Sequence, residues 1–134
     1  MKHWILKRKD NQAALELHGQ FDWADEFNWQ SLAQSEGVRS LSGALIIQQG
    51  LKLAGRPITL NGSRARLSLG DLRQLQAWAD VPELTMQLDS PDGRQFSVIF
   101  RRPALNEMAA IKPYRLAERQ EDDAWRVNIQ LMTI

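Results

Sequence analysis

The residues that come closest to a reactive site lie between positions 21 and 29. Three carboxylates are interleaved there with aromatic side chains: Phe21, Asp22, Trp23, Asp25, Glu26, Phe27 and Trp29. Sugar-cleaving sites use this chemistry, with two carboxyl groups acting as acid and nucleophile or base. Asp25 and Glu26 form the candidate pair. Neighbouring residues on an extended segment point to opposite faces, however, so we do not expect these two carboxylates to converge on one bond.

A second interpretation of this cluster is that its aromatic rings pack against protein. Trp23, Phe27 and Trp29 would then anchor a loop on the core or fill a pocket of a neighbouring subunit. Tryptophan is enriched at the hot spots of protein interfaces. We therefore favour packing over carbohydrate chemistry and keep a carbohydrate-binding or glycan-cleaving module, built on Asp22, Asp25, Glu26 and Trp23, as the alternative.

The remaining candidates for chemistry are weaker. His3 and His18 each lie in or beside an expected strand, and no motif brings a nucleophile or further metal ligands to either of them. Asp89, Asp92 and Gly93 supply too few acids for a calcium loop and are typical of a turn. Phosphate-binding glycine motifs are absent from the sequence. We expect no catalytic, cofactor-binding or metal-binding residues and no enzymatic activity.

The composition sets further limits. A chain of 134 residues fits a single domain, 1–134. Its net charge of +1 does not favour specific nucleic-acid binding. With no cysteine, the chain forms no disulfide and no thiolate metal site. We also expect no secretory signal and no membrane insertion, because the apolar runs are too short.

The patterning predicts one helix among several strands. Leu69 to Ala79 carries an apolar residue every third position and follows Ser68, a natural N-cap. Alternation of apolar and polar residues predicts strands at 4–6, 14–17, 84–89, 95–101 and 125–133. The turn at 90–93 makes a hairpin of the third and fourth of these strands. We expect 102–123 to be a mostly polar loop, broken by Pro103 and Pro113, with Ala109 to Ile111 as a candidate short strand.

The stretch from 44 to 60 predicts the longest strand of the chain. Apolar residues alternate from Ala44 to Leu53, and Gly50 indicates a bulge or a close approach of another backbone. A turn at 55–57 then leads into a short strand at 58–60. With irregular segments at 21–29 and 31–40, the order predicts an α+β, mostly β fold. We expect an antiparallel sandwich or barrel with one flanking helix.

Four tracts resemble a family of small tail proteins from long-tailed bacteriophages and prophages. They are WADEFNWQSLAQS, RSLSGALIIQQGLKLAGRPITLNG, DGRQFSVIFRR and the C-terminal DDAWRVNIQLMTI. The match spans most of the chain, with its motifs in the same order. The resemblance implies a tail-tube-like or distal-tail-like fold and a non-enzymatic virion component. It also implies a homo-oligomeric ring, commonly a hexamer, that contacts the tail tube and surrounds the tape-measure protein.

On this resemblance we expect a minor tail protein at the distal end of the tube. It would be assembled in the bacterial cytoplasm and would reside in the virion tail, where it joins the tube to the tail tip. Residues 44–60 would supply a hairpin between subunits. We expect the subunit interface to include Trp23, Phe27, Trp29, Ile46, Ile47, Leu51 and Leu53.

Overall fold

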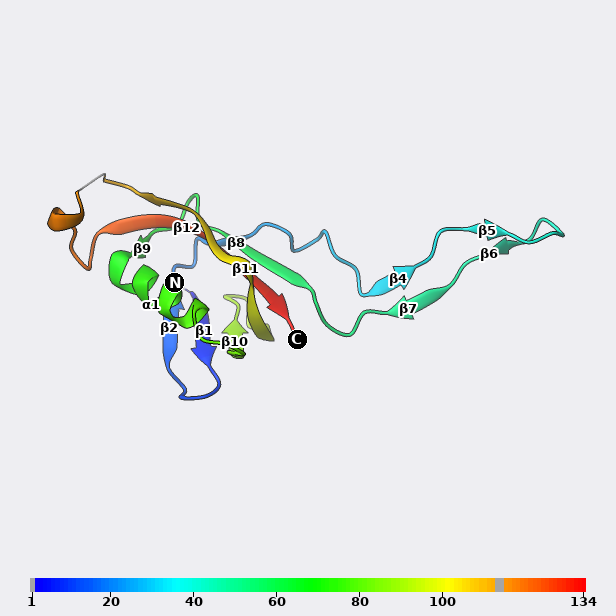
Figure 1. Cartoon of the computed structure of the whole chain (residues 1–134), viewed down its shortest axis with the longest axis horizontal. Coiled ribbons are helices and arrows are strands. Elements are labelled where there is room, and N and C mark those ends of the chain that lie inside the picture. Colours follow the sequence, from blue (N-terminus) through cyan, green and yellow to red (C-terminus); the bar gives the residue numbers. More distant parts are fainter. Residues whose placement is uncertain (1, 113–114) are drawn as a thin grey trace.

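The computed structural model describes residues 2–112 and 115–134 and consists of a folded body with one long projection (Figure 1). The body contains an antiparallel sheet in the order β2-β1-β10-β11-β12-β8-β3, with β9 paired to β12. Its strands are β1 (Trp4–Arg8), β2 (Ala14–Leu17), β3 (Asp22–Trp23), β8 (Pro57–Asn61), β9 (Leu67–Ser68), β10 (Met86–Asp89), β11 (Gln95–Ala110) and β12 (Ala124–Thr133). The expected α+β, mostly β class is confirmed. The described strands do not close into a barrel, since the order ends on β2 and β3.

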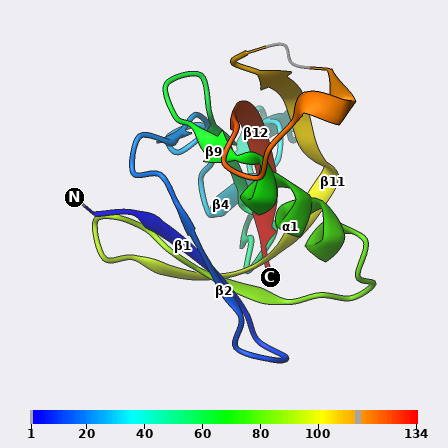
Figure 2. The ribbon, with the colours of Figure 1, turned by 90° about the vertical axis from the view of Figure 1, so that its left-hand side faces the viewer.

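The helix α1 (Leu69–Ala79) has the predicted bounds and covers the inner side of the curved sheet (Figure 2). The Ser68 hydroxyl accepts a hydrogen bond of 3.2 Å from the Asp71 N–H, which caps the first turn. Leu69, Leu72, Leu75 and Trp78 are all buried, so the stripe of every third residue faces the core. The helix contacts β11 and β12, the central strands of the sheet.

The expected strands are present, with different lengths. The first two pair as a hairpin, with Leu6 opposite Leu15. β10 and β11 form the second hairpin, with Leu88 opposite Phe96. The inward-facing residues of these strands join one buried core: Leu6, Leu15, Leu17, Met86, Leu88, Val98, Ile129 and Leu131 among others. The alternation in the sequence therefore identified the core side of each strand.

The expectation of a polar loop is wrong over residues 102–108, whereas the candidate short strand at 109–111 is confirmed at Ala109 and Ala110. β11 continues through Pro103 to Ala110 and pairs with β12, where Ala110 lies opposite Trp125. The register of β11 with β12 shifts between Phe100 and Leu105. Pro103, which has no N–H to donate, lies within this irregularity of the ladder, where proline is tolerated. A 3₁₀ turn, η1 (Leu116–Glu118), follows before β12, and Pro113 lies outside the described residues.

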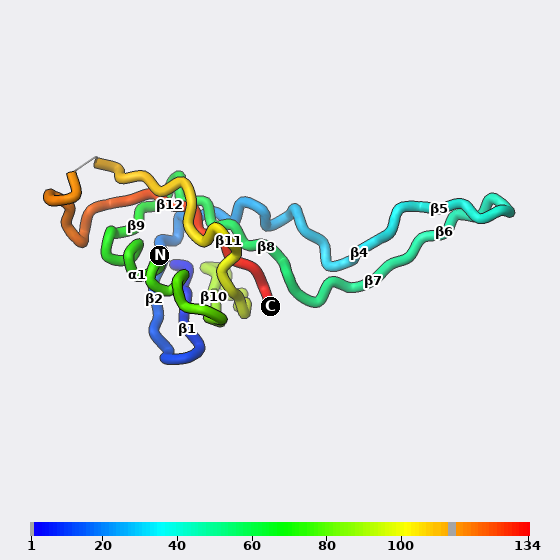
Figure 3. The backbone as a smooth tube through the Cα atoms, in the orientation of Figure 1, coloured from blue at the N-terminus to red at the C-terminus, as the bar shows by residue number. Residues whose placement is uncertain are grey.

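The expectation of one long strand over 44–53 also needs correction. The segment contains β6 (Leu45–Ile46) and β7 (Gln49–Leu51), which pair with β5 (Val38–Arg39) and β4 (Leu32–Gln34) respectively. Gly50 is in regular register opposite Ala33, with open space where a side chain would be. It is therefore neither a bulge nor a point of close backbone approach. These four strands form the projection, which leaves the body beside the C-terminus (Figure 3).

Candidate functional site

The most unusual feature of the structure is the projection, residues 31–54, which we call the arm. Two short antiparallel ladders build it: Leu32 pairs with Leu51, and farther out Val38 pairs with Ile46. Between the ladders, the Ser35 N–H donates to the Gln48 carbonyl over 2.8 Å, so the two sides of the arm stay together. The arm extends away from the body along its whole length (Figure 1).

The arm presents aliphatic side chains to solvent. Every arm residue is exposed except Ser40, which is half-buried. The large apolar residues exposed along it are Leu32, Val38, Leu41, Leu45, Ile46, Ile47, Leu51 and Leu53. Glu36, Arg39 and Lys52 are its only charged residues. An exposed surface with this many large apolar side chains and so few charges is typical of a surface that another protein covers.

The root of the arm is tied to the end of β12. The Gly55 N–H donates to the Thr133 carbonyl over 2.9 Å, and the Arg56 N–H donates to the Thr133 hydroxyl over the same distance. The Thr133 N–H returns a bond of 3.0 Å to the Arg56 carbonyl. The arm therefore leaves the sheet in a direction set by three hydrogen bonds to Thr133, at the end of a central strand of the body.

Arg56 adds an aromatic contact at the same root. Its guanidinium carbon lies 4.4 Å from the centre of the Trp23 ring and 5.8 Å from that of Trp29. Its Nη2 also donates to the Glu26 carbonyl over 3.0 Å. Cation–π contacts of this kind are stronger where water is partly excluded. Arg56 thus fixes the segment that enters the arm against the segment that leaves it.

The three aromatic interface candidates, Trp23, Phe27 and Trp29, differ in how far each side chain is buried in its own chain. Trp23 is only 9% exposed and packs edge-on against Trp4 and Phe96, so its ring belongs to the core of its own chain. This corrects its assignment to the subunit interface. Phe27 is 89% exposed, and Trp29 is half-buried at the arm root, where Lys52 Nζ lies 4.8 Å from its ring centre. Phe27 and Trp29 remain available to a partner.

The other interface candidates, Ile46, Ile47, Leu51 and Leu53, all lie on the arm. Sequence reasoning missed Leu32, Val38 and Leu41 on the same arm, and it included Leu45 only as part of the expected hairpin at 44–60. The three missed residues occur singly among Ser, Gln and Gly in what reads as a polar loop. The available signal was that apolar residues continue through this loop while charges are almost missing.

The two acids of the candidate pair have separate structural partners. Asp25 accepts hydrogen bonds from the Thr59 N–H over 2.9 Å and from the Thr59 hydroxyl over 2.8 Å. Glu26 instead forms an ion pair of 2.6 Å with Arg94. The segment is a turn here rather than an extended strand, but the two carboxylates still do not act on one point. Each of them ties this turn to a different part of the sheet.

Three of the four alternative carbohydrate residues do line one small hollow. Asp22, Trp23 and Glu26 border a space of about 210 Å³ together with residues of the β10–β11 turn, whereas Asp25 does not. The ring of Trp23 is covered by Arg56 at 4.4 Å and by Arg94 at 5.1 Å, both measured from the guanidinium carbon to the ring centre. A buried and covered ring offers no face on which a sugar could stack.

Arg94 also controls the acidity of Asp92 in the β10–β11 turn. The Arg94 side chain donates a hydrogen bond to the Asp92 carboxylate, and the Ser90 hydroxyl donates a second one. Together these two hydrogen bonds lower the pKa of Asp92 from 3.8 to about 2. The folded pKa lies below the unfolded one, so the stabilisation is complete above about pH 4 and is lost as the pH falls through 2. We expect the melting temperature of wild type to exceed that of Asp92→Asn at pH 6, and the difference to vanish near pH 2. Thermal unfolding followed by circular dichroism checks this, and a difference that does not change with pH would contradict it.

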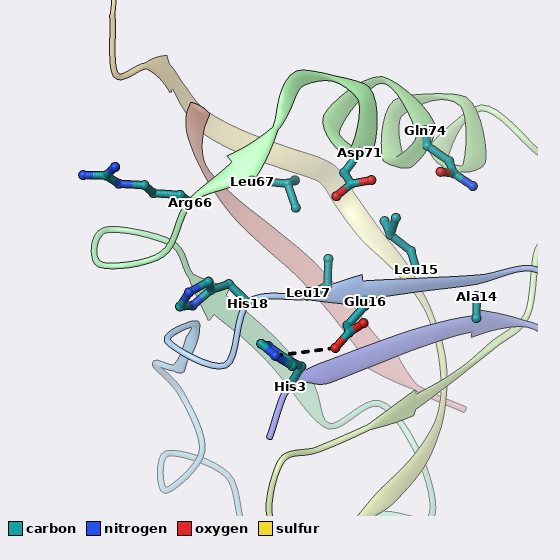
Figure 4. A pocket seen from close by; sticks show the side chains of 10 residues that line it. All are labelled: His3, Ala14, Leu15, Glu16, Leu17, His18, Arg66, Leu67, Asp71 and Gln74. Atoms are coloured by element: carbon teal, nitrogen blue, oxygen red, sulfur yellow. Dashed lines mark ion pairs between the residues drawn. The ribbon is translucent and has the colours of Figure 1, made fainter. Parts of the chain in front are cut away.

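The two histidines lie at a hollow of about 620 Å³ between β2 and the start of α1 (Figure 4). The Nδ1 atom of His3 accepts from the Gly19 N–H over 3.2 Å, and that of His18 accepts from the Gln20 N–H over 3.0 Å. His3 Nε2 is 3.5 Å from a Glu16 carboxylate oxygen. Both imidazoles therefore hold the turn after β2. Within 2–112 and 115–134, no three His, Cys, Asp or Glu side chains are placed to hold a metal ion.

No helix in the described part of the chain has the length and apolar character needed to cross a membrane. Comparison with family models, with curated proteins and with solved structures finds no match to this chain. The arm and its root are accordingly the candidate functional site on geometry alone.

Proposed function

We propose that this protein is a structural component of a bacteriophage or prophage tail. It would be a minor tail protein that assembles as a homo-oligomeric ring, a hexamer in this proposal, and joins the tail tube to the tail tip. One observation carries the proposal: the body projects a rooted arm that exposes eight large aliphatic side chains and only three charged ones. The sequence resemblance to small tail proteins supports the same assignment. The partners in this proposal are further copies of the chain, the tail tube and the tape-measure protein.

The arm suits a ring for a geometric reason. A projection on one side of a subunit can contact a different surface of the next subunit, which is a heterologous interface, and such interfaces close into rings when the rotation fits. In this proposal Ile46, Ile47, Leu51 and Leu53 contact the neighbour, with Phe27 and Trp29 at the arm root beside it. The carbohydrate alternative lacks an exposed aromatic ring among Asp22, Trp23 and Glu26, so assembly is the function that we put forward.

The experiment is to measure the mass of the assembled species. Native mass spectrometry and sedimentation of the full chain over a range of concentrations should show one closed oligomer, and negative-stain electron microscopy should show rings. A chain that stays monomeric at the highest concentration would overturn the proposal. A closed ring of another size would correct the hexamer and leave the ring in place.

A further inference from the structure

The tip of the arm presents one leucine in an unusually ordered setting. Leu41 is the second residue of the turn that joins β5 to β6, and its side chain is fully exposed (111%). In that turn the Gly43 N–H donates to the Ser40 carbonyl over 2.9 Å, and the Ser40 N–H donates to the Ala44 carbonyl over 2.8 Å. Gly43 has φ +87°, the left-handed conformation with which such hairpin loops end.

Side chains stiffen this tip further. The Ala44 N–H donates to the Ser40 hydroxyl over 3.1 Å, and that hydroxyl lies 2.9 Å from the hydroxyl of Ser42. Arg39 Nη1 donates to the Gly43 carbonyl over 3.2 Å. A leucine held out by a turn with this many bonds is preorganised, so less conformational entropy is lost when a pocket receives it.

The body carries a hollow of matching size and chemistry beside the end of α1. Its volume is about 130 Å³, and it is lined by Val81, Glu83, Leu84, Ile99, Phe100 and Arg102. An apolar cavity of about 150 Å³ accommodates a benzene molecule, so this hollow has room for a leucine side chain. The aliphatic and aromatic members form its wall. Glu83 and Arg102 are the exposed, charged members of the lining.

The charges near the tip complement those of the hollow. Near the tip, Arg39 lies on β5 and Glu36 lies just before that strand. The hollow likewise carries one acidic and one basic residue, Glu83 and Arg102. Over residues 2–112 and 115–134, none of these four side chains takes part in an ion pair. All four are exposed, so each can meet an opposite charge on another molecule without first breaking a salt bridge.

We propose that Leu41 of one copy inserts into the Val81–Arg102 hollow of a second copy, with Arg39 beside Glu83. The arm carries the tip far from its own body, so the contact forms between molecules (Figure 3). Tip and hollow are different surfaces of the same chain, so the contact is heterologous and repeats from copy to copy. This inference rests on the proposed function and names the surface that receives the arm.

Because the chain has no cysteine, pairs of single cysteines can map this contact directly. A Leu41→Cys chain is mixed with a mass-tagged Ile99→Cys chain, oxidised and analysed on a non-reducing gel. We expect a disulfide between the two chains, since the tip would bring the sulfurs within bonding reach. The matched control is Leu41→Cys with Met108→Cys, a partly exposed position on the same strand outside the hollow, which should remain uncrosslinked.

Charge reversal gives an independent readout by sedimentation. Arg39→Glu and Glu83→Arg should each weaken association by about fivefold, and the double variant should restore it, as expected of a direct exposed pair. An assembly that forms without the Leu41–Ile99 crosslink and without this rescue would overturn the inference and leave the proposed function standing. A wild-type chain that never associates would overturn both.

Discussion

A variant that lacks the arm should remain monomeric at concentrations where wild type assembles. The deletion can join Ser31 to Lys52, because these two residues already lie side by side: the Lys52 N–H donates to the Ser31 carbonyl over 2.7 Å. Replacing residues 32–51 by Asn-Gly therefore closes the chain with a two-residue hairpin turn. We expect association to weaken by at least about a hundredfold, which corresponds to about 2.7 kcal/mol. Sedimentation equilibrium measures this difference.

The same variant should keep the stability of the body. No residue between 24 and 57 belongs to the buried core, so its removal opens no cavity. A matched variant keeps the full-length arm and changes Ile46, Leu51 and Leu53 to Ser. It should also be monomeric, because it removes apolar contact area without shortening the arm. If the Ser variant assembles like wild type, contact through the arm's aliphatic side chains is the wrong explanation.

The body of this protein could be predicted from local pattern to a large extent. Helix α1 follows from its three-residue spacing and the Ser68 cap, and the two hairpins follow from alternation and turn residues. These features are set by neighbours in sequence. The extension of β11 past Pro103 could not be predicted this way, because pairing with β12 overrides a polar composition that is typical of a loop.

The position of the arm, in contrast, could not be predicted from local sequence pattern. Its residues have strand-like composition, but local pattern does not say whether a strand joins the body or leaves it. That outcome depends on where β12 ends, because Thr133 fixes Gly55 and Arg56 and so directs the arm outward. For the same reason Trp23 and Phe27, four residues apart, have opposite environments: β3 holds Trp23 in the sheet, whereas the following turn exposes Phe27. Aromatic composition alone cannot separate an interface anchor from a core residue.

Substitution of Trp23 and of Phe27 should distinguish a core residue from an interface residue, because the two changes differ greatly in their effect on the free energy of unfolding. In the armless variant, where association does not contribute to stability, Trp23→Ala should lower the free energy of unfolding by about 3–5 kcal/mol. The ring is nearly buried among Trp4, Phe96 and the guanidinium groups of Arg56 and Arg94, and its loss would leave a cavity that these groups cannot all fill.

Phe27→Ala in the same background should change the free energy of unfolding by less than about 0.5 kcal/mol, as is usual for an exposed position. Urea unfolding followed by far-ultraviolet circular dichroism measures both values without relying on tryptophan fluorescence. In the full-length chain the expected ranking for association is the reverse: Phe27→Ala should weaken the assembly while Trp23→Ala acts only through folding. Trp23→Ala with unchanged stability and lost assembly would return Trp23 to the subunit interface.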